Sequence, residues 1–240
     1  MKIHVLKDGD FCVDKNKVFT PLEELASATG LKMAVQPFLI EVEDHVVLLD
    51  AGLGRYHKGS PVILNNLLAL GFNPSCITTI LLSHLHKDHI AGLVNTQVNE
   101  WFLNFPDAKI YMQKREYLFA KSKTNNPSFD FDILDFITEN GNIVWMDEDK
   151  GVICSEISFE VTGGHTPFHQ VFLIRDKESI AFYGADNLPT AGYLKYPIAF
   201  KSDFNGKKAM EQRTEWEKLA KAEHWKVLLY HDMKRAILQF

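Results

Sequence analysis

The chain has 240 residues, 46% of them hydrophobic and 24% charged, so it can bury a full core, and we expect one domain spanning residues 1–240. The net charge of -5 and the lack of an extended basic cluster argue against a nucleic-acid partner. We expect a cytoplasmic protein without a membrane partner. The apolar runs are too short for a membrane span, the N-terminus is charged and does not resemble a secretion signal, and the three cysteines are scattered.

Apolar runs and turn residues predict the following elements in chain order: a hairpin within residues 1–20 with its turn at residues 7–10, strands at 38–42 and 46–49, a helix at 61–70, a strand at 77–82, helices at 112–123 and 128–140, strands at 143–145, 157–161, 171–174 and 180–183, a helix at 207–223 and a last strand at 227–230. The first helix has the clearest boundaries, because Ser60 and Pro61 suit its start and Gly71 suits its end. Strands alternate with helices late in the chain, which predicts an α/β class with a layered sheet core.

The most specific pattern is a His-x-His-x-Asp-His sequence that directly follows the strand predicted at 77–82. His84 and His86 lie on one face of an extended segment, and a loop after them can return Asp88 and His89 to the same point. These imidazoles and the carboxylate are costly to bury without a partner, and a divalent metal is such a partner. A solvated loop with chance histidines is the alternative, which the apolar residues on both sides disfavour.

This motif and four others, in the same order along the chain, resemble those of the metallo-β-lactamase superfamily. The other four are Asp50 in Leu-Asp-Ala-Gly, His165 and His169 in Gly-His-Thr-x-x-His, Asp186 in Gly-Ala-Asp, and His231 in Tyr-His-Asp. The resemblance extends over nearly the whole chain and implies the α/β class with a four-layer αββα metallo-β-lactamase sandwich.

The resemblance also implies a ligand set for two divalent metal ions. It assigns His84, His86 and His165 to the first metal, Asp88, His89 and His231 to the second, and Asp186 to a bridge between them. Asp50 has no place among these ligands, so we expect it to orient a ligand imidazole, and we expect His169 to brace its loop. Imidazoles and carboxylates suit zinc, our first choice, with manganese or iron as alternatives.

Such a centre predicts a hydrolase. A bound metal lowers the pKa of water from 15.7 to about 7, and a second metal stabilises the developing oxyanion. We expect Asp88 to be catalytic as well as a ligand, because it is placed to orient the nucleophile. A small ester or lactone is the expected substrate, and phosphodiester or thioester hydrolysis is the alternative on the same fold. A persulfide dioxygenase with one iron, and a binding protein that has lost catalysis, also stay open.

The segment after the bridging aspartate is predicted to select a small-molecule substrate. Its Tyr193, Tyr196 and Phe200 suit an aromatic pocket wall, although packing into the core explains aromatic residues equally well. The segment is similar to that of acyl-homoserine lactonases. Those enzymes carry a tyrosine three residues after the bridging aspartate, where this chain has Pro189. The sequence leaves the oligomeric state open.

Overall fold

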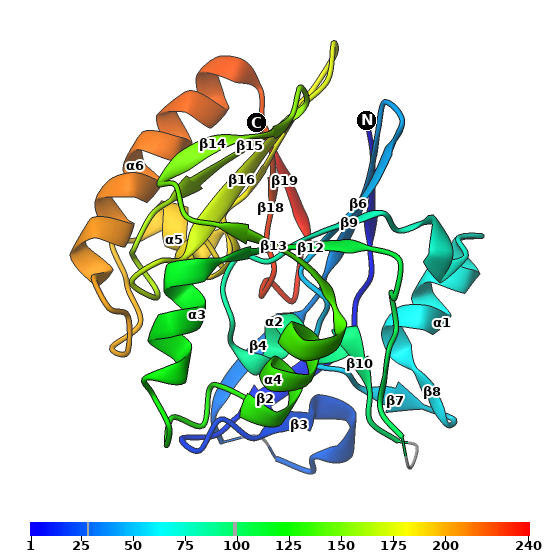
Figure 1. The fold of residues 1–240 in the computed structure, drawn as a ribbon. Helices are drawn as coiled ribbons and strands as arrows, with labels where there is room; N and C mark the ends of the chain where they lie inside the picture. Colours follow the sequence, from blue (N-terminus) through cyan, green and yellow to red (C-terminus); the bar gives the residue numbers. More distant parts are fainter. Residues whose placement is uncertain (28, 98–99) are drawn as a thin grey trace.

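Two six-stranded sheets form the centre of the computed structural model, which describes residues 1–27, 29–97 and 100–240 (Figure 1). The first sheet contains, in spatial order, β1 (Lys2–Val5), β5 (Phe38–Val42), β6 (His45–Leu49), β9 (Thr79–Leu81), β12 (Lys109–Gln113) and β13 (Asn142–Met146). The second contains β14 (Lys150–Cys154), β15 (Ile157–Val161), β16 (Gln170–Arg175), β17 (Ile180–Tyr183), β18 (Lys226–Leu228) and β19 (Ile237–Gln239).

Shorter strands and the helices surround these sheets. A three-stranded sheet has the order β3 (Phe19–Pro21), β2 (Gly9–Val13) and β4 (Leu31–Val35), and two short pairs are β7 (Tyr56–His57) with β8 (Ser60–Pro61) and β10 (Val94–Asn95) with β11 (Phe102–Leu103). The α-helices are α1 (Val62–Ala69), α2 (Lys87–Ile90), α3 (Lys114–Lys121), α4 (Phe131–Asn140), α5 (Gly192–Lys195) and α6 (Gly206–Glu223). Among the residues described, no helix has the length and hydrophobicity needed to cross a bilayer.

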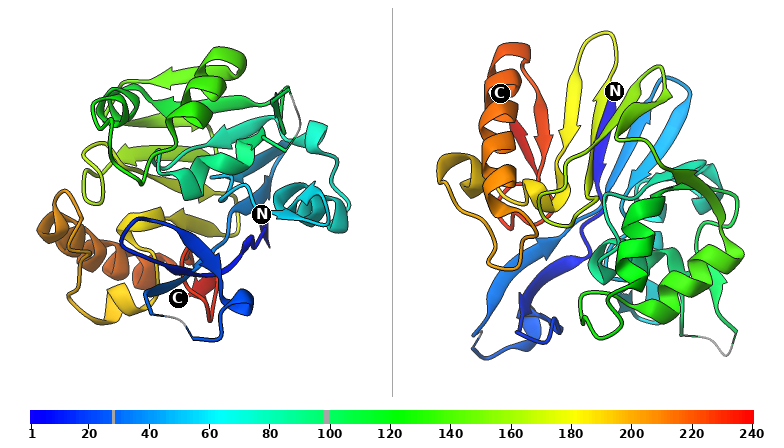
Figure 2. Two further views of the ribbon diagram at one scale, coloured as in Figure 1. Left: turned by 90° about the horizontal axis from the view of Figure 1, so that it is seen from below. Right: turned by 60° about the vertical axis from the view of Figure 1, so that its left-hand side comes forward.

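The alternation of side chains along the strands produces four layers. In β6, Leu48 packs on the side of α1 and α4, whereas Leu49 packs between the two sheets. In β17, Tyr183 faces this central core and Phe182 packs on the other side against Trp216 of α6. Figure 2 shows α6 covering the second sheet while α3 and α4 lie beside the first. Each fully buried Leu or Phe contributes about 1.5–3 kcal/mol, so this αββα sandwich gives the site a rigid support.

Two expectations about the N-terminal quarter are wrong. β1 and β2 do not form a hairpin, because β1 pairs with β5 whereas β2 pairs with β3 and β4. The turn at residues 7–10 therefore moves the chain from one sheet to another. Helix α1 begins at Val62 and has no side-chain cap, and Ser60 instead pairs with His57 in a short strand pair. The helices predicted at 112–123, 128–140 and 207–223 are present as α3, α4 and α6, with bounds that differ by a few residues at most ends.

One edge of the sandwich collects the loops that carry the chemical motifs. Strands β6 and β9 are parallel, as are β17 and β18, so each pair ends at a common edge. The antiparallel β16 begins at the edge where β17 ends. The three-stranded sheet lies below this edge, at the bottom of Figure 1. Residues far apart in the sequence therefore meet between the sandwich and the three-stranded sheet.

Candidate metal centre

Four histidines and aspartates of the predicted ligand set form one cluster. His84 follows β9, His86 lies two residues later, His165 is in the loop before β16, and Asp186 follows β17. Nδ1 of His86 is 3.0 Å from Nε2 of His84 and 3.2 Å from Nε2 of His165. Oδ2 of Asp186 is 3.2 Å from Nε2 of His165. One ligand atom from each residue fits within a group whose members all lie within 4.8 Å of one another.

A second cluster adjoins the first, and Asp186 contacts both. Asp88 and His89 belong to α2, and His231 follows β18. Oδ2 of Asp88 is 3.7 Å from Nε2 of His89 and 3.6 Å from Nε2 of His231. Oδ1 of Asp186 lies 3.3 Å from Nε2 of His89 and 2.9 Å from Nε2 of His231. The two oxygens of Asp186 therefore face different clusters.

The donor atoms fit divalent cations. Nε2 of His89 and Oδ1 of Asp186 are buried, and neither has a well-aligned hydrogen-bond partner in the part of the chain that the structure describes. Burying such atoms without a partner is unfavourable, and a metal ion satisfies both. Imidazole nitrogens and carboxylate oxygens are the donors that zinc and similar metals take.

The imidazoles and carboxylates of the cluster shift one another's pKa values. Burial lowers the pKa of His84 and His86 well below its usual range, and neighbouring imidazoles lower it further, so both are neutral at neutral pH. Burial also acts to lower the pKa of His89, but nearby carboxylates, led by Asp88, raise it well above its usual value. Burial acts to raise the pKa of Asp186, but His231 and other imidazoles hold it well below its usual value. Asp186 is therefore an anion between the imidazoles.

The second ring nitrogen of four histidines has a partner. Nδ1 lies 3.1 Å from Ser83 Oγ in His84, 2.7 Å from an Asp50 oxygen in His89, 2.7 Å from an Asp203 oxygen in His165, and 2.6 Å from the Ala34 carbonyl in His231. Each arrangement is consistent with a proton on Nδ1, which leaves Nε2 to face its cluster. His86 differs, because its Nδ1 is the nitrogen that faces the others.

Of these partners, Asp50 accepts four hydrogen bonds. Its side chain is fully buried, and Oδ1 accepts the backbone N–H of Ser83 at 2.8 Å. Oδ2 accepts from Ser83 Oγ at 2.6 Å, from His89 Nδ1 at 2.7 Å and from the Tyr183 hydroxyl at 2.5 Å. Four donor groups from three residues therefore converge on one carboxylate, which fixes the imidazole of His89.

The loop that carries His165 depends on side chains that the sequence did not single out. Oδ1 of Asn187 accepts the backbone N–H of His165 at 2.6 Å, and Nδ2 of Asn187 donates to Thr162 Oγ1 at 2.6 Å. His169 is buried at the base of the loop, where its carbonyl accepts the Thr162 N–H at 2.7 Å. A Cβ atom at Gly164 would lie 2.5 Å from Asn187 Oδ1, so the loop needs glycine there.

The structure separates the three aromatic residues proposed for substrate binding. Phe200 lines the hollow that contains the metal-binding cluster. Tyr193 and Tyr196 line a different hollow together with Arg213. The Tyr193 ring lies 5.5 Å from the Phe200 ring and 5.0 Å from the Arg213 guanidinium, so it packs behind Phe200. Another part of the wall of this hollow comes from the three-stranded sheet, which no sequence pattern indicated.

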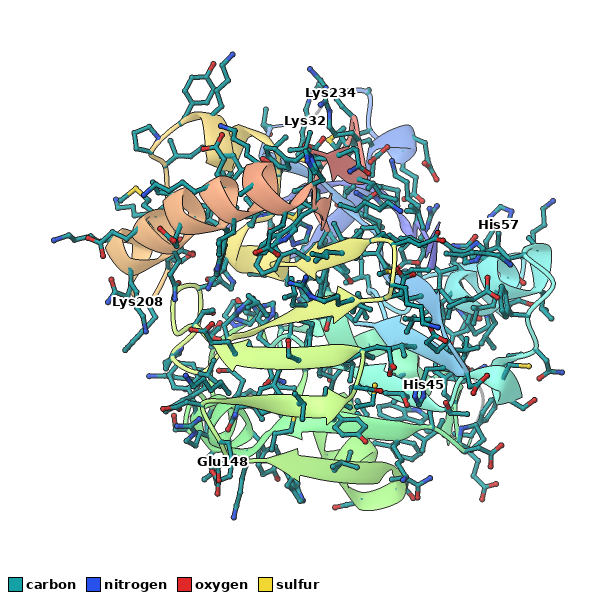
Figure 3. All side chains as sticks on the ribbon, turned by 90° about the horizontal axis from the view of Figure 1, so that it is seen from above. Lys32, His45, His57, Glu148, Lys208 and Lys234 are labelled. Atoms are coloured by element: carbon teal, nitrogen blue, oxygen red, sulfur yellow. The ribbon has the colours of Figure 1, made fainter. Side chains whose placement is uncertain are left out.

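Histidines outside the motifs lie elsewhere. His57 belongs to the short strand β7 and is exposed at the periphery of the molecule, away from the centre of the sandwich (Figure 3). His45 lies at the start of β6, whereas Asp50 follows the other end of that strand. Neither residue belongs to the two clusters that contain the predicted ligands.

Comparisons with known proteins agree with this geometry. The family model of the metallo-beta-lactamase superfamily matches residues 32–231. An N-acyl homoserine lactonase from a Bacillus species is 28% identical over 198 residues, which cover 74% of this chain and 72% of that protein. A probable metal-dependent hydrolase from Staphylococcus aureus has a TM-score of 0.78 at 18% identity, covering 99% of this chain and 91% of its own. AidC, a dizinc quorum-quenching lactonase, has a TM-score of 0.74 at 23% identity, covering 98% and 88%. The chain therefore belongs to the metallo-β-lactamase superfamily.

Proposed function

We propose that this protein is a metal-dependent hydrolase that binds two divalent metals, zinc in the first place, and cleaves a small lactone or ester. The observation that carries the proposal is the position of Asp186, whose two oxygens face two separate sets of donors. A carboxylate shared in this way is expected of a bridging ligand. The N-acyl homoserine lactonase relatives support a lactone as the substrate class.

Bound metal ions would lower the pKa of a coordinated water to about 7 and polarise a carbonyl oxygen. The protein contributes the position and proton chemistry of the nucleophile. Asp88 lines the hollow and its side chain is 10% exposed, so its carboxylate can accept a hydrogen bond from a water molecule there. The Tyr230 hydroxyl donates to the Asp88 carbonyl at 2.7 Å and holds this residue in place. Asp88 is therefore our candidate for orienting the attacking water.

The shape of the hollow favours a small substrate with an apolar part. Phe200 lines it together with Phe19 and Met33 of the three-stranded sheet. Apolar walls around a few polar groups are typical of sites for small molecules. The scissile carbonyl would face the metal ligands, and the acyl part would contact these walls.

The proposal is tested by metal analysis combined with a panel of lactones, esters, thioesters and phosphodiesters. We expect two metals per chain in the native protein. His86→Ala and Asp186→Asn should each lose metal and lactonase or esterase activity together, because both residues supply donors to the cluster. His57→Ala is the control, since this histidine is exposed and outside the clusters.

The outcomes separate the alternatives. A His86→Ala protein that keeps two metals would contradict the ligand set. Turnover of phosphodiesters or thioesters alone would contradict the substrate class and leave the metal centre intact. Oxygen consumption with a persulfide, at one iron per chain, would replace the hydrolase by an oxygenase.

A further inference from the structure

Two adjoining hollows open at the metal-binding cluster and share the side chains of His86 and His165. Their other charged residues are all basic, apart from the carboxylates of the proposed metal ligands. The basic residues are Lys17 and Lys87 in the first hollow, and Lys15, Lys17 and Lys123 in the second. This local charge contrasts with the net charge of -5 for the whole chain.

None of these four lysines belongs to an ion pair in the part of the chain that the structure describes. The ion pairs that lysines form in the described part of the chain involve Lys2, Lys7, Lys121, Lys207, Lys218 and Lys221. The four ammonium groups around the hollows therefore have no carboxylate partner among the described residues. Lys87 is half-buried between the ligands His86 and Asp88, where an unpaired charge is less hydrated than on an open surface.

Lys17 lies in a hydrogen-bonded turn between β2 and β3. Lys17 has a φ of 58°, a left-handed conformation that a lysine adopts less readily than glycine or asparagine. The turn is held by Asp14, whose Oδ1 accepts the backbone N–H of Asn16 at 2.8 Å and of Val18 at 2.9 Å. This turn between β2 and β3 therefore places the half-buried Lys17 at the wall of the hollow.

The apolar walls and the lysines together describe the shape of a ligand. Phe19 and Met33 would contact an apolar segment next to the scissile carbonyl, and Lys17 and Lys87 line the same hollow. We propose that the substrate of this hydrolase carries a carboxylate or phosphate at the far end of a short acyl arm, and that Lys17 and Lys87 bind this anion. The inference rests on the proposed lactonase or esterase function and names its substrate class.

The test compares homoserine lactones whose acyl arms have matched length. N-glutaryl-homoserine lactone ends in a carboxylate, N-pentanoyl-homoserine lactone ends in a methyl group, and a third arm ends in phosphate. We expect the zinc-loaded protein to hydrolyse an anionic lactone with a higher kcat/KM than the neutral one, by up to about 25-fold, because two lysine contacts of up to about fivefold each combine. The more reactive of the two anionic arms identifies carboxylate or phosphate as the preferred group.

Variants of Lys17 and Lys87, together with a change of salt concentration, test whether these two lysines bind the anionic end of the acyl arm. Lys17→Asn keeps a side chain that tolerates the left-handed turn, and Lys87→Gln keeps a long polar side chain. Each should reduce the anionic-to-neutral ratio several-fold at unchanged metal content. Raising the salt from about 0.01 M to about 1 M shortens the screening length from about 30 Å to about 3 Å and should also reduce the ratio. Lys177→Met is the matched control, because Lys177 is exposed in the turn after β16, at the end of the strand far from His169.

Binding of the ring-opened products, measured by calorimetry, keeps the two proposals distinguishable. N-glutaryl-homoserine and N-pentanoyl-homoserine both carry the carboxylate that ring opening produces, so they differ only in the far end of the arm. Equal hydrolysis of all three lactones would overturn the anion proposal and leave the hydrolase intact. If no lactone or ester is hydrolysed, the hydrolase proposal fails. In that case, tighter binding of the glutaryl product that is lost in Lys17→Asn would still support the anion site, and equal binding would overturn it.

Discussion

Replacing Asp50 by asparagine tests how strongly the metal centre depends on a residue that we do not propose as a ligand. Asp50 has a φ of 52°, and asparagine tolerates this left-handed conformation as well as aspartate does. The backbone should therefore stay unchanged, and any effect reports on hydrogen bonding. The side chain is fully buried, so water cannot replace a lost partner.

The geometry leaves no good orientation for the new amide. If its oxygen takes the place of Oδ2, its NH₂ group faces the backbone N–H of Ser83, which donates to Oδ1 at 2.8 Å. If the amide is turned over, its NH₂ group faces three donors, including Nδ1 of His89 at 2.7 Å. At least one buried donor loses its acceptor in either case. We expect the free energy of unfolding to fall by about 2–5 kcal/mol.

Metal affinity should fall with it, because the imidazole of His89 loses a fixed, charged partner. Changes to such supporting residues typically reduce metal affinity by about 10–100-fold. Urea unfolding of the metal-free protein gives the first quantity, and competition with a zinc chelator gives the second. Tyr183→Phe is the matched control, since it removes one donor from Oδ2 and leaves the bond to His89 in place. An Asp50→Asn protein with the wild-type free energy of unfolding and zinc affinity would refute the reasoning.

Two further predictions concern carboxylates that the sequence did not indicate. Asp203→Asn should weaken zinc binding by about 10–100-fold in chelator competition, because Asp203 holds Nδ1 of His165 at 2.7 Å; unchanged affinity would show that the loop orients His165 without it. Burial raises the pKa of Asp8 to about 6 from its usual value of 3.8, so the stability that its neutral carboxyl contributes is complete below pH 3.8 and is lost as the pH rises to about 6. The side chain at this position in the Asp8→Asn variant stays neutral at every pH. The variant's free energy of unfolding relative to the wild type should therefore rise by up to about 3 kcal/mol between about pH 4 and pH 8, measured in paired urea titrations. A difference that does not change with pH would contradict this.

The residues that the sequence placed together correctly are those that sit in short, specific motifs. His84, His86, Asp88 and His89 lie within six positions, so their proximity needs only one strand end and one turn. The layered fold was predictable for a similar reason, since alternation along a strand such as β6 already separates its two faces.

Partners brought together by tertiary contacts were not predictable in this way. Asp203 is 38 positions from His165, and nothing between them indicates the bond. The pairing of β1 with β5 instead of β2 depends on which distant strand offers a buried edge. Tyr193 and Tyr196 belong to the expected segment, but packing of the short helix α5 against α6 directs them to a different hollow. The sequence shows that this segment is rich in aromatic residues, but packing against the neighbouring helix α6 determines where their side chains lie.

The three-stranded sheet connects the wall of the hollow to His231, a proposed metal ligand. Ala34 and His231 make two hydrogen bonds, from His231 Nδ1 to the Ala34 carbonyl at 2.6 Å and from the Ala34 N–H to the His231 carbonyl at 3.2 Å. Met33, the residue before Ala34 on β4, lines the hollow. A displacement of β4 by a bulky substrate would therefore also move the imidazole that we assign to the second metal. Phe19 lines the same hollow from β3, which pairs with β2 and not with β4, so its side chain can adapt to the substrate without disturbing His231.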